Sequence, residues 1–217
     1  MLLLRPPGVY RVGRDSTLLA QVLARPGRAL GRHVLDVGTG TGVLALTAAR
    51  AGARSVTAVD LSWRSTAATW LNCRTRGVAV RVRRGNLFEP VRGRRFDLVV
   101  ANPPYVPAPA SAPPRHRISR CWDAGLNGRM LVDRICAEAP DVLADGGVLL
   151  LLHSRVCGEA RTLSRLATVG LNGRVVARAV LPFGPVMAAR AALLEARGLI
   201  APGQREEEIV VVEARHG

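Results

Sequence analysis

The chain has 217 residues, 48% of them hydrophobic, and carries a formal net charge of +15 at pH 7. This length predicts one domain, residues 1–217, able to bury roughly 70% of its unfolded surface. No apolar run is long enough to span a bilayer, and the leucine-rich start breaks at Pro6 and Pro7. We therefore expect no membrane segment and a cytoplasmic protein.

The positive charge is carried by arginine alone, because the 31 basic residues include no lysine. These arginines are scattered among apolar and acidic residues, a pattern that favours a solvated surface over a phosphate-binding track. A nucleic-acid partner therefore stays open but is not favoured. The 4 cysteines and 4 histidines show neither metal-ligand spacing nor a Cys-x-x-Cys pair, so we expect no metal site and no disulfide framework.

Strand-like and helix-like segments alternate along the chain. Strand patterns occur at His33–Val37, Ser55–Val59, Val78–Val82, Phe96–Ala101, Val148–Leu152, Val175–Leu181 and Ile209–Val212. Helix patterns occur at Val43–Arg50, Ser62–Arg76, Leu126–Leu143, Gly158–Thr168 and Met187–Arg197, and residues 1–30 are interpreted as an N-terminal lid or helix segment. The alternation predicts an α/β fold, a Rossmann-like, seven-stranded, mostly parallel sheet with helices on both faces. Ligands of such sheets bind past the carboxyl ends of the strands.

The first strand runs into a glycine-rich turn from Asp36 to Gly42. Glycines let the backbone turn tightly and approach a ligand closely. The G-x-G-x-G spacing differs from the dinucleotide fingerprint, and the absence of lysine excludes a P-loop. A carboxylate at Asp36 would repel pyrophosphate and attract an ammonium group, which favours S-adenosylmethionine (SAM) as the cofactor. The cofactor-binding residues predicted in this turn are Asp36, Gly38, Thr39, Gly40 and Gly42.

Polar residues also follow the second and third strands. Asp60 ends the second strand, where a carboxylate can accept both ribose hydroxyls of a nucleoside. Asn86 follows the third strand, and its side-chain carbonyl could accept the adenine amino group, with Leu61 and Leu87 on the two faces of the ring. Each residue alone could be only a helix cap or a turn former. Their order at successive strand ends favours the cofactor site.

The fourth strand ends in Asn102-Pro103-Pro104-Tyr105. Residues that precede proline avoid the helical region, and proline has no N–H, so this turn offers oxygen atoms and few donors. The Asn102 side chain and the Pro103 carbonyl suit a planar –NH2 group, and the Tyr105 ring could cover its face. We predict Asn102, Pro103 and Tyr105 as catalytic residues, with Asn102 also touching the cofactor. The plainer interpretation is a proline-rich turn that ends a strand.

With these motifs in this order, the chain resembles the class I SAM-dependent methyltransferases. More narrowly, it resembles the short form of the HemK-type protein glutamine N5-methyltransferases. Residues 7–11 and 15–19 are similar to the N-terminal signature of that form, in which an Asp-Thr pair lies near the cofactor pocket; here Asp15 is followed by Ser16. Residues 122–128 match the glycine-rich segment of the family loosely. The resemblance implies the class I methyltransferase fold and methyl transfer to a glutamine, the family's target being the Gly-Gly-Gln loop of peptide-chain release factors.

Other functions stay open at this point. A base amine of RNA or DNA is also a flat –NH2 donor, and the same pocket would serve it. A small-molecule methyltransferase and a non-catalytic SAM-binding module are further alternatives. The loop at residues 103–114 could contact either kind of macromolecule, and Arg115, Arg117 and Arg120 could touch phosphates, although a solvated rim is the favoured interpretation of these arginines. We expect a protein substrate, no membrane partner and a monomer.

Overall fold

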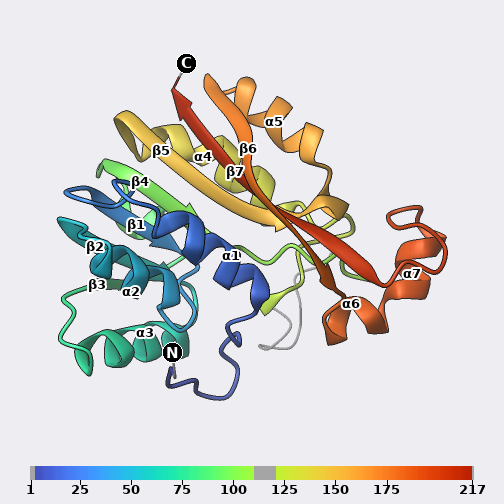
Figure 1. Ribbon diagram of the computed structural model, residues 1–217, viewed down its shortest axis with the longest axis horizontal. Coiled ribbons are helices and arrows are strands. Elements are labelled where there is room, and N and C mark those ends of the chain that lie inside the picture. The colour runs from blue at the N-terminus through green and yellow to red at the C-terminus, as the bar shows by residue number, and fades with distance from the viewer. Residues whose placement is uncertain (1–2, 110–120, 217) are drawn as a thin grey trace.

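A computed structural model of the protein describes residues 3–109 and 121–216. Its centre is a seven-stranded sheet in the order β3-β2-β1-β4-β5-β7-β6 (Figure 1). The strands are β1 (His33–Val37), β2 (Ser55–Asp60), β3 (Arg81–Arg84), β4 (Phe96–Ala101), β5 (Leu143–Ser154), β6 (Leu171–Pro182) and β7 (Glu206–His216). Strands β1 to β5 pair in parallel, whereas β7 is antiparallel to both of its neighbours. The predicted fold class is confirmed.

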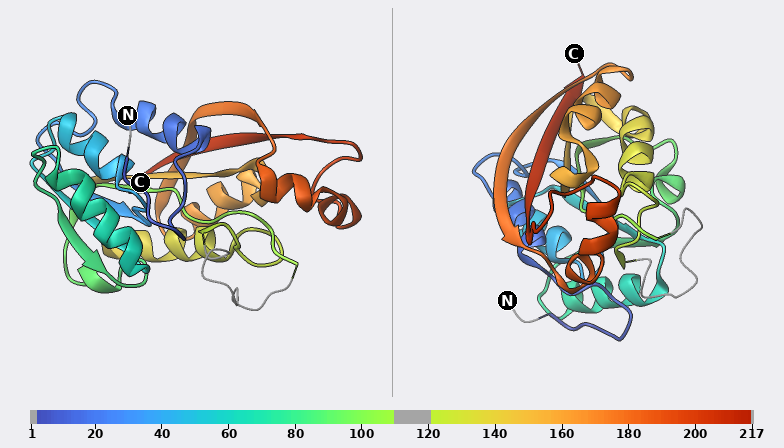
Figure 2. Two further views of the ribbon diagram at one scale, coloured as in Figure 1. Left: turned by 90° about the horizontal axis from the view of Figure 1, so that it is seen from below. Right: turned by 90° about the vertical axis from the view of Figure 1, so that its right-hand side faces the viewer.

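Helices cover both faces of this sheet (Figure 2). One face carries α1 (Arg14–Leu23) and α2 (Val43–Arg50), with α3 (Trp63–Arg74) next to α2; the other carries α4 (Met130–Glu138) and α5 (Glu159–Ala167). Short helices α6 (Pro185–Ala189) and α7 (Ala191–Ala196) lie in the connection from β6 to β7. Single 3-10 turns occur at Glu89–Val91, Ala139–Asp141 and Arg155–Cys157. Within the described residues, no helix is both long and apolar enough to cross a membrane.

The central strand β5 shows why the sheet is buried on both sides. Leu149 and Leu151 point into the core cluster formed with α4 and α5. Val148, Leu150 and Leu152 point into the cluster formed with α1 and α2. An uninterrupted apolar run is expected where both faces of a strand are covered, because alternation then brings no side chain to solvent.

The third strand begins later than its sequence pattern predicts. The run of alternating valines suggested Val78–Val82, whereas β3 starts at Arg81. The backbone N–H of Val78 donates to the Cys73 carbonyl at 3.0 Å and thereby closes the end of α3. The first residues of the apolar run therefore terminate a helix before the chain joins the sheet.

Two predicted helices also differ from the structure. The helix expected at Leu126–Leu143 begins only at Met130, because Gly128 has a φ of +74° that a right-handed helix does not accommodate. The helix expected at Met187–Arg197 is split into α6 and α7, since Arg190 leaves helical geometry with φ −102° and ψ 2°.

Candidate active site

The carboxyl ends of β1, β2, β3 and β4 open into one cavity of about 500 Å³. Every predicted site residue lines this cavity except Asp36 and Gly42. The N-terminal segment, the start of α6 and Glu207 on β7 complete its wall. Parallel strands end at a common edge, so residues far apart in the sequence meet there. The interactions proposed for Arg115, Arg117 and Arg120 lie outside the described residues.

The glycine turn leaves space beside its backbone. Gly38 and Gly40 have φ values of +74° and +58°, and a Cβ on Gly38 would meet no heavy atom within 4 Å. Gly42 differs, because a Cβ there would lie 2.9 Å from the Thr69 methyl group of α3. The first two glycines thus keep the cavity side of the turn open, and the third allows α3 to pack closely.

Asp36 lies beneath this turn and is fully buried. Its Oδ2 accepts hydrogen bonds from Thr39 Oγ1 at 2.6 Å and from Ala45 N, in the first turn of α2, at 3.0 Å. Its Oδ1 is buried without a hydrogen-bond partner among the described residues. Burial raises the pKa of Asp36 to about 7, and the two hydrogen bonds oppose that shift. An unpaired carboxylate oxygen under an open glycine turn fits a ligand that carries an ammonium group.

Asp60 joins the end of β2 to the glycine turn. Its Oδ2 accepts from Gly40 N at 2.9 Å, and its Oδ1 accepts from Ser62 N at 2.8 Å. Burial raises the pKa of Asp60, whereas these backbone hydrogen bonds lower it. Each carboxylate oxygen keeps a further lone pair, so Asp60 retains the capacity to accept ribose hydroxyls.

Asn86 is partly engaged by its neighbours. Its Oδ1 accepts from Arg134 Nη1 and its Nδ2 donates to Glu89 Oε1, both at 3.3 Å. Next to it, Leu87 has a φ of +47°. It is the only non-glycine residue in the described ranges with a positive φ. Leu61 lies across the cavity rim with 53% of its surface exposed. The adenine contacts of Asn86, Leu61 and Leu87 stay predictions.

The Asn102 side chain is held by the first turn of α1. Its Nδ2 donates to Asp15 Oδ2 at 3.1 Å and to Ser16 Oγ at 3.0 Å. A carboxylate only accepts hydrogen bonds, so this network assigns the –NH2 end of Asn102 to α1 and leaves Oδ1 facing away from it. The signal for this contact in the sequence was the Asp-Ser pair of the family signature.

Two tyrosines converge on the same carboxylate. Tyr10 and Tyr105 donate their hydroxyls to Asp15 Oδ2 at 3.1 and 3.4 Å. Burial and the neighbouring Asp15 raise the pKa of both phenols, which keeps them neutral donors. Asp15 is therefore the common acceptor that ties the N-terminal segment to the catalytic turn. Tyr10 lies within the signature at residues 7–11, but nothing in the sequence assigned its hydroxyl to Asp15.

The backbone of Tyr105 is fixed from the opposite side. A Cβ on Gly128 would lie 2.2 Å from the Tyr105 carbonyl oxygen, so only glycine allows this approach. Cys157 Sγ donates to the same oxygen at 3.2 Å. Burial, opposed by nearby Arg129, raises the pKa of the Cys157 thiol to about 12, so it keeps the proton that it donates.

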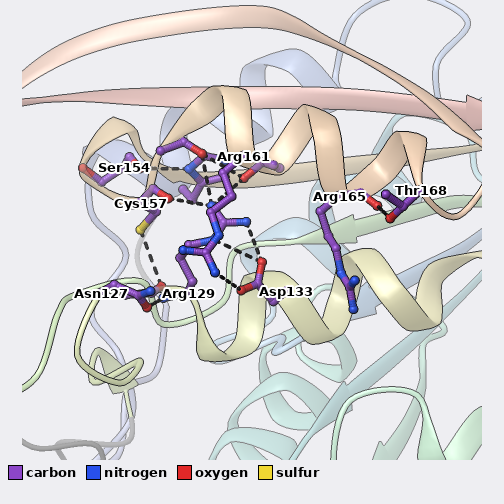
Figure 3. Close-up of polar contacts among 12 residues, drawn as sticks. Asn127, Arg129, Asp133, Ser154, Cys157, Arg161, Arg165 and Thr168 are labelled. Atoms are coloured by element: carbon purple, nitrogen blue, oxygen red, sulfur yellow. Dashed lines mark hydrogen bonds and ion pairs between the residues drawn. The ribbon is translucent and has the colours of Figure 1, made fainter.

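Arg129 fastens this loop to the connection between β5 and α5 (Figure 3). Its guanidinium is buried and donates to Cys157 O at 2.6 Å, Gly158 O at 3.1 Å and Thr162 Oγ1 at 3.0 Å. It also forms an ion pair with Asp133, with Nη2 2.6 Å from Oδ1. A buried charge with this many partners is costly to disturb, because removing it leaves several polar groups unpaired.

Comparisons with known proteins decide the family. The profile described as "Methyltransferase small domain" matches residues 2–117. A Methanocaldococcus jannaschii protein with the provisional name protein N5-glutamine methyltransferase is 32% identical over 181 residues, which cover 83% of this chain and 90% of the relative. The chain belongs to this methyltransferase family. The resemblance to the HemK-type enzymes is thereby confirmed, and the protein is a SAM-dependent methyltransferase.

Other relatives of this methyltransferase differ in the substrate that their names state. A release factor glutamine methyltransferase of Xylella fastidiosa is 36% identical over 168 residues, covering 71% of this chain and 58% of the relative. The ribosomal RNA small subunit methyltransferase C of Alcanivorax borkumensis is 36% identical over 154 residues, covering 69% of this chain and 41% of the relative. These two relatives are longer proteins, of which this chain spans roughly half.

Among solved structures, the E. cuniculi Mtq2–Trm112 complex matches with a TM-score of 0.67 and 23% identity. The match covers 97% of this chain and 99% of that chain. That complex is described as responsible for methylation of the eRF1 translation termination factor. At this identity the match supports the methyltransferase fold and not the substrate.

Proposed function

We propose that the enzyme transfers the methyl group of SAM to the side-chain nitrogen of a glutamine in a protein, with a peptide-chain release factor as the substrate. The orientation of the Asn102 amide carries this proposal. Its –NH2 end is bound to Asp15 and Ser16, so its Oδ1 is left to accept from a substrate. With the Pro103 carbonyl, Oδ1 offers two acceptors for the two hydrogens of a primary amide.

An amide nitrogen is a poor nucleophile because its lone pair is delocalised into the carbonyl group. Acceptors on both of its N–H bonds increase the electron density on nitrogen and fix the direction of the lone pair. Such orientation accounts for roughly 7–11 kcal/mol in favourable intramolecular reactions. Bound SAM supplies an electrophilic methyl group on a positively charged sulfur. As the bond from nitrogen to the methyl carbon forms, the carbon–sulfur bond would break and the cofactor would leave as a neutral thioether, so the positive charge passes to the substrate nitrogen. That nitrogen then loses its proton to solvent, so no general base has to act first.

The residues that would hold SAM fit that cofactor. Asp36 does not line the cavity, so its carboxylate, with the unpaired Oδ1, would attract the ammonium group from beneath the turn, and the open space at Gly38 would admit the chain that carries it. Asp60 and Asn86 both line the cavity, which supports a role for Asp60 in accepting the ribose hydroxyls. These assignments follow from the donors and acceptors present.

The charges around the cavity favour a protein over a nucleic acid. Arg64 and Arg84 line the cofactor side, close to Asp60. On the acceptor side, the described lining residues include the acids Asp15 and Glu207 and no arginine. Carboxylates repel the phosphates that a base would bring with it. The names of the relatives support the same choice, although the ribosomal RNA relative keeps a base amine as the second candidate.

A labelling experiment tests this function. The enzyme is incubated with methyl-labelled SAM and, separately, with release factors, total RNA and DNA, and labelled protein is mapped by mass spectrometry. We expect label on one glutamine of a release factor, lost when that glutamine is replaced by alanine in the substrate. The Asn102→Ala enzyme serves as the inactive control. Label in RNA or DNA, with none in protein, would refute the proposal.

We also infer that the protein is a single-domain monomer in which residues 1–30 act as a lid. Gly8, Tyr10 and Asp15 of this segment line the cavity, which supports a covering role. Light scattering checks the monomer. Limited proteolysis with and without SAM checks the lid, since a lid that closes over the cofactor should be cut more slowly when SAM is bound.

A further inference from the structure

We propose that Glu207 is a substrate-binding residue whose carboxylate accepts a hydrogen bond from a main-chain N–H of the peptide that presents the glutamine. The inference rests on the proposed function and adds the anchor for the substrate backbone. It starts from topology. Because β7 is antiparallel to β5, its first residues lie at the edge where the parallel strands end. Glu207, paired with Leu181 of β6, is the second residue of β7 and therefore reaches the cavity.

The Glu207 side chain has an unmet hydrogen-bonding capacity at this place. It is 6% exposed and lines the cavity together with Asn102 and Tyr105. Its Oε2 is buried and has no hydrogen-bond partner in the described part of the chain. Burial raises the pKa of Glu207 and the nearby Ser154 side chain opposes that shift, while Oε2 stays available to a donor. A buried acceptor without a donor costs free energy, and a ligand N–H would remove that cost.

The surroundings indicate what kind of donor arrives. Val106, Val186 and Met187 also line the cavity and pack with Tyr105 in one apolar cluster. The second acid on this side, Asp15, already accepts from Asn102 and two tyrosines. The acceptors for the reacting –NH2 group are assigned to Asn102 and Pro103, so Glu207 is left for another donor. A main-chain N–H beside the glutamine accompanies every peptide substrate, whatever its flanking side chains.

The first test uses Glu207→Ala and Glu207→Gln, with Glu206→Gln as the matched control. Glu206 is the exposed neighbour on the same strand and loses the same charge. With a synthetic peptide that contains Gly-Gly-Gln, we expect Glu207→Ala to raise the peptide KM about 10- to 100-fold, with kcat within about threefold and SAM affinity unchanged. Glu207→Gln should recover part of the loss, because its side-chain oxygen still accepts. Glu206→Gln should match the wild-type enzyme.

An unchanged peptide KM in Glu207→Ala would overturn the inference. An equal loss of SAM affinity, measured by calorimetry, would assign Glu207 to the cofactor or to the fold and would also overturn it. Thermal unfolding of each variant separates such a structural role from a binding role. If the wild-type enzyme methylates only nucleic acid, the proposed function fails first and this inference fails with it. If the wild-type enzyme methylates the peptide and Glu207→Ala leaves the peptide KM unchanged, only this inference is refuted and the proposed function stands.

A second test identifies the donor. In a series of peptides, each main-chain N–H near the glutamine is replaced in turn by an ester oxygen. One replacement should raise KM for the wild-type enzyme and have no further effect on Glu207→Ala, because both changes remove the same hydrogen bond. If, at every position, the ester replacement raises KM by the same factor in Glu207→Ala as in the wild-type enzyme, the two changes act independently and the main-chain assignment is refuted. A parallel series replaces each flanking polar side chain of the peptide by alanine, and a loss that depends on Glu207 in this series would identify a side-chain donor instead.

Discussion

Asp15 is predicted to control catalysis without contacting SAM. Its Oδ2 is the acceptor for Asn102 Nδ2 and for the hydroxyls of Tyr10 and Tyr105. In Asp15→Ala the Asn102 amide keeps only Ser16 as a partner and is free to rotate. When it rotates, Nδ2 replaces Oδ1 toward the substrate, and a donor then faces the –NH2 group that it should bind. We expect methyl transfer to slow while SAM affinity stays unchanged.

The size of the effect follows from the bond that is lost. A hydrogen bond to a charged group contributes about 1.5–3 kcal/mol. At about 1.4 kcal/mol for each factor of ten, that range predicts a decrease of about 10- to 150-fold in the rate of methyl transfer. The unpaired tyrosine hydroxyls should also lower the free energy of unfolding by about 1–3 kcal/mol. For a chain of this size, each kcal/mol corresponds to about 2–4 °C in Tm.

Single-turnover transfer from labelled SAM at 25 °C, well below the unfolding transition, measures the rate, and calorimetry measures SAM affinity. Asp15→Asn should lose less activity than Asp15→Ala, because its side-chain oxygen can still accept from Asn102. Asp145→Asn is the matched control, since Asp145 is exposed near the start of β5. A folded Asp15→Ala enzyme that transfers methyl groups within threefold of the wild-type rate would show that the orientation of Asn102 does not depend on this carboxylate.

Three more substitutions test the rest of the site. Asn102→Ala should abolish methyl transfer, because it removes the oxygen that accepts from the substrate –NH2 group, while calorimetry should give a SAM affinity within about threefold of wild type. Full activity would remove Asn102 from the mechanism. Asp36 has a pKa of about 7 in the folded protein, so the folded state holds an extra proton between the unfolded pKa of about 4 and pH 7, and stability falls as pH rises through that window. In urea titrations, the free energy of unfolding should fall by about 2–3 kcal/mol less between pH 5 and pH 8 in Asp36→Asn than in the wild type. An identical pH dependence in both proteins would contradict the raised pKa of Asp36. Gly128→Ala would place a Cβ 2.2 Å from the Tyr105 carbonyl oxygen, so transfer should fall by more than tenfold while calorimetry shows intact SAM binding, and normal turnover would argue that the loop position is not critical.

The arrangement around the cavity could be predicted from the sequence wherever a residue lies next to the end of a parallel strand. Asp60 and Asn102 each lie at the end of a recognisable apolar run, and topology then brings them to one edge with Asn86, whose strand β3 is mostly arginine and begins later than its pattern predicts. The contact between Asp15 and Asn102 joins residues 87 positions apart, and no periodicity encodes it. Only the family signature pointed to Asp15, because its position depends on how α1 packs across the sheet.

The role of Glu207 could not be predicted from the sequence for a different reason. It is the middle member of the run Glu206-Glu207-Glu208, and a run of acids usually indicates a solvated surface. Alternation along β7 directs Glu207 to the cavity, whereas its neighbours face other surroundings: Glu206 is exposed and Glu208 is paired with Arg155 and Arg178. The antiparallel direction of β7, which no local pattern reveals, decides that this end of the strand reaches the site.

The net charge of +15 does not by itself indicate a nucleic-acid partner. Several arginines serve the scaffold as donors to backbone carbonyls. Arg190 donates to Pro107 O at 2.9 Å, and Arg197 donates to Ala108 O and Pro109 O, both at 2.8 Å. A guanidinium suits this task because it offers five N–H donors in a planar group and never loses its charge at neutral pH. These two side chains tie the α6–α7 region to the chain that follows the catalytic turn, so they position the acceptor side of the cavity and do not lie along a path for phosphates. Among the described residues that line the acceptor side of the cavity, the charged groups are the carboxylates of Asp15 and Glu207, a pattern that suits the binding of N–H donors.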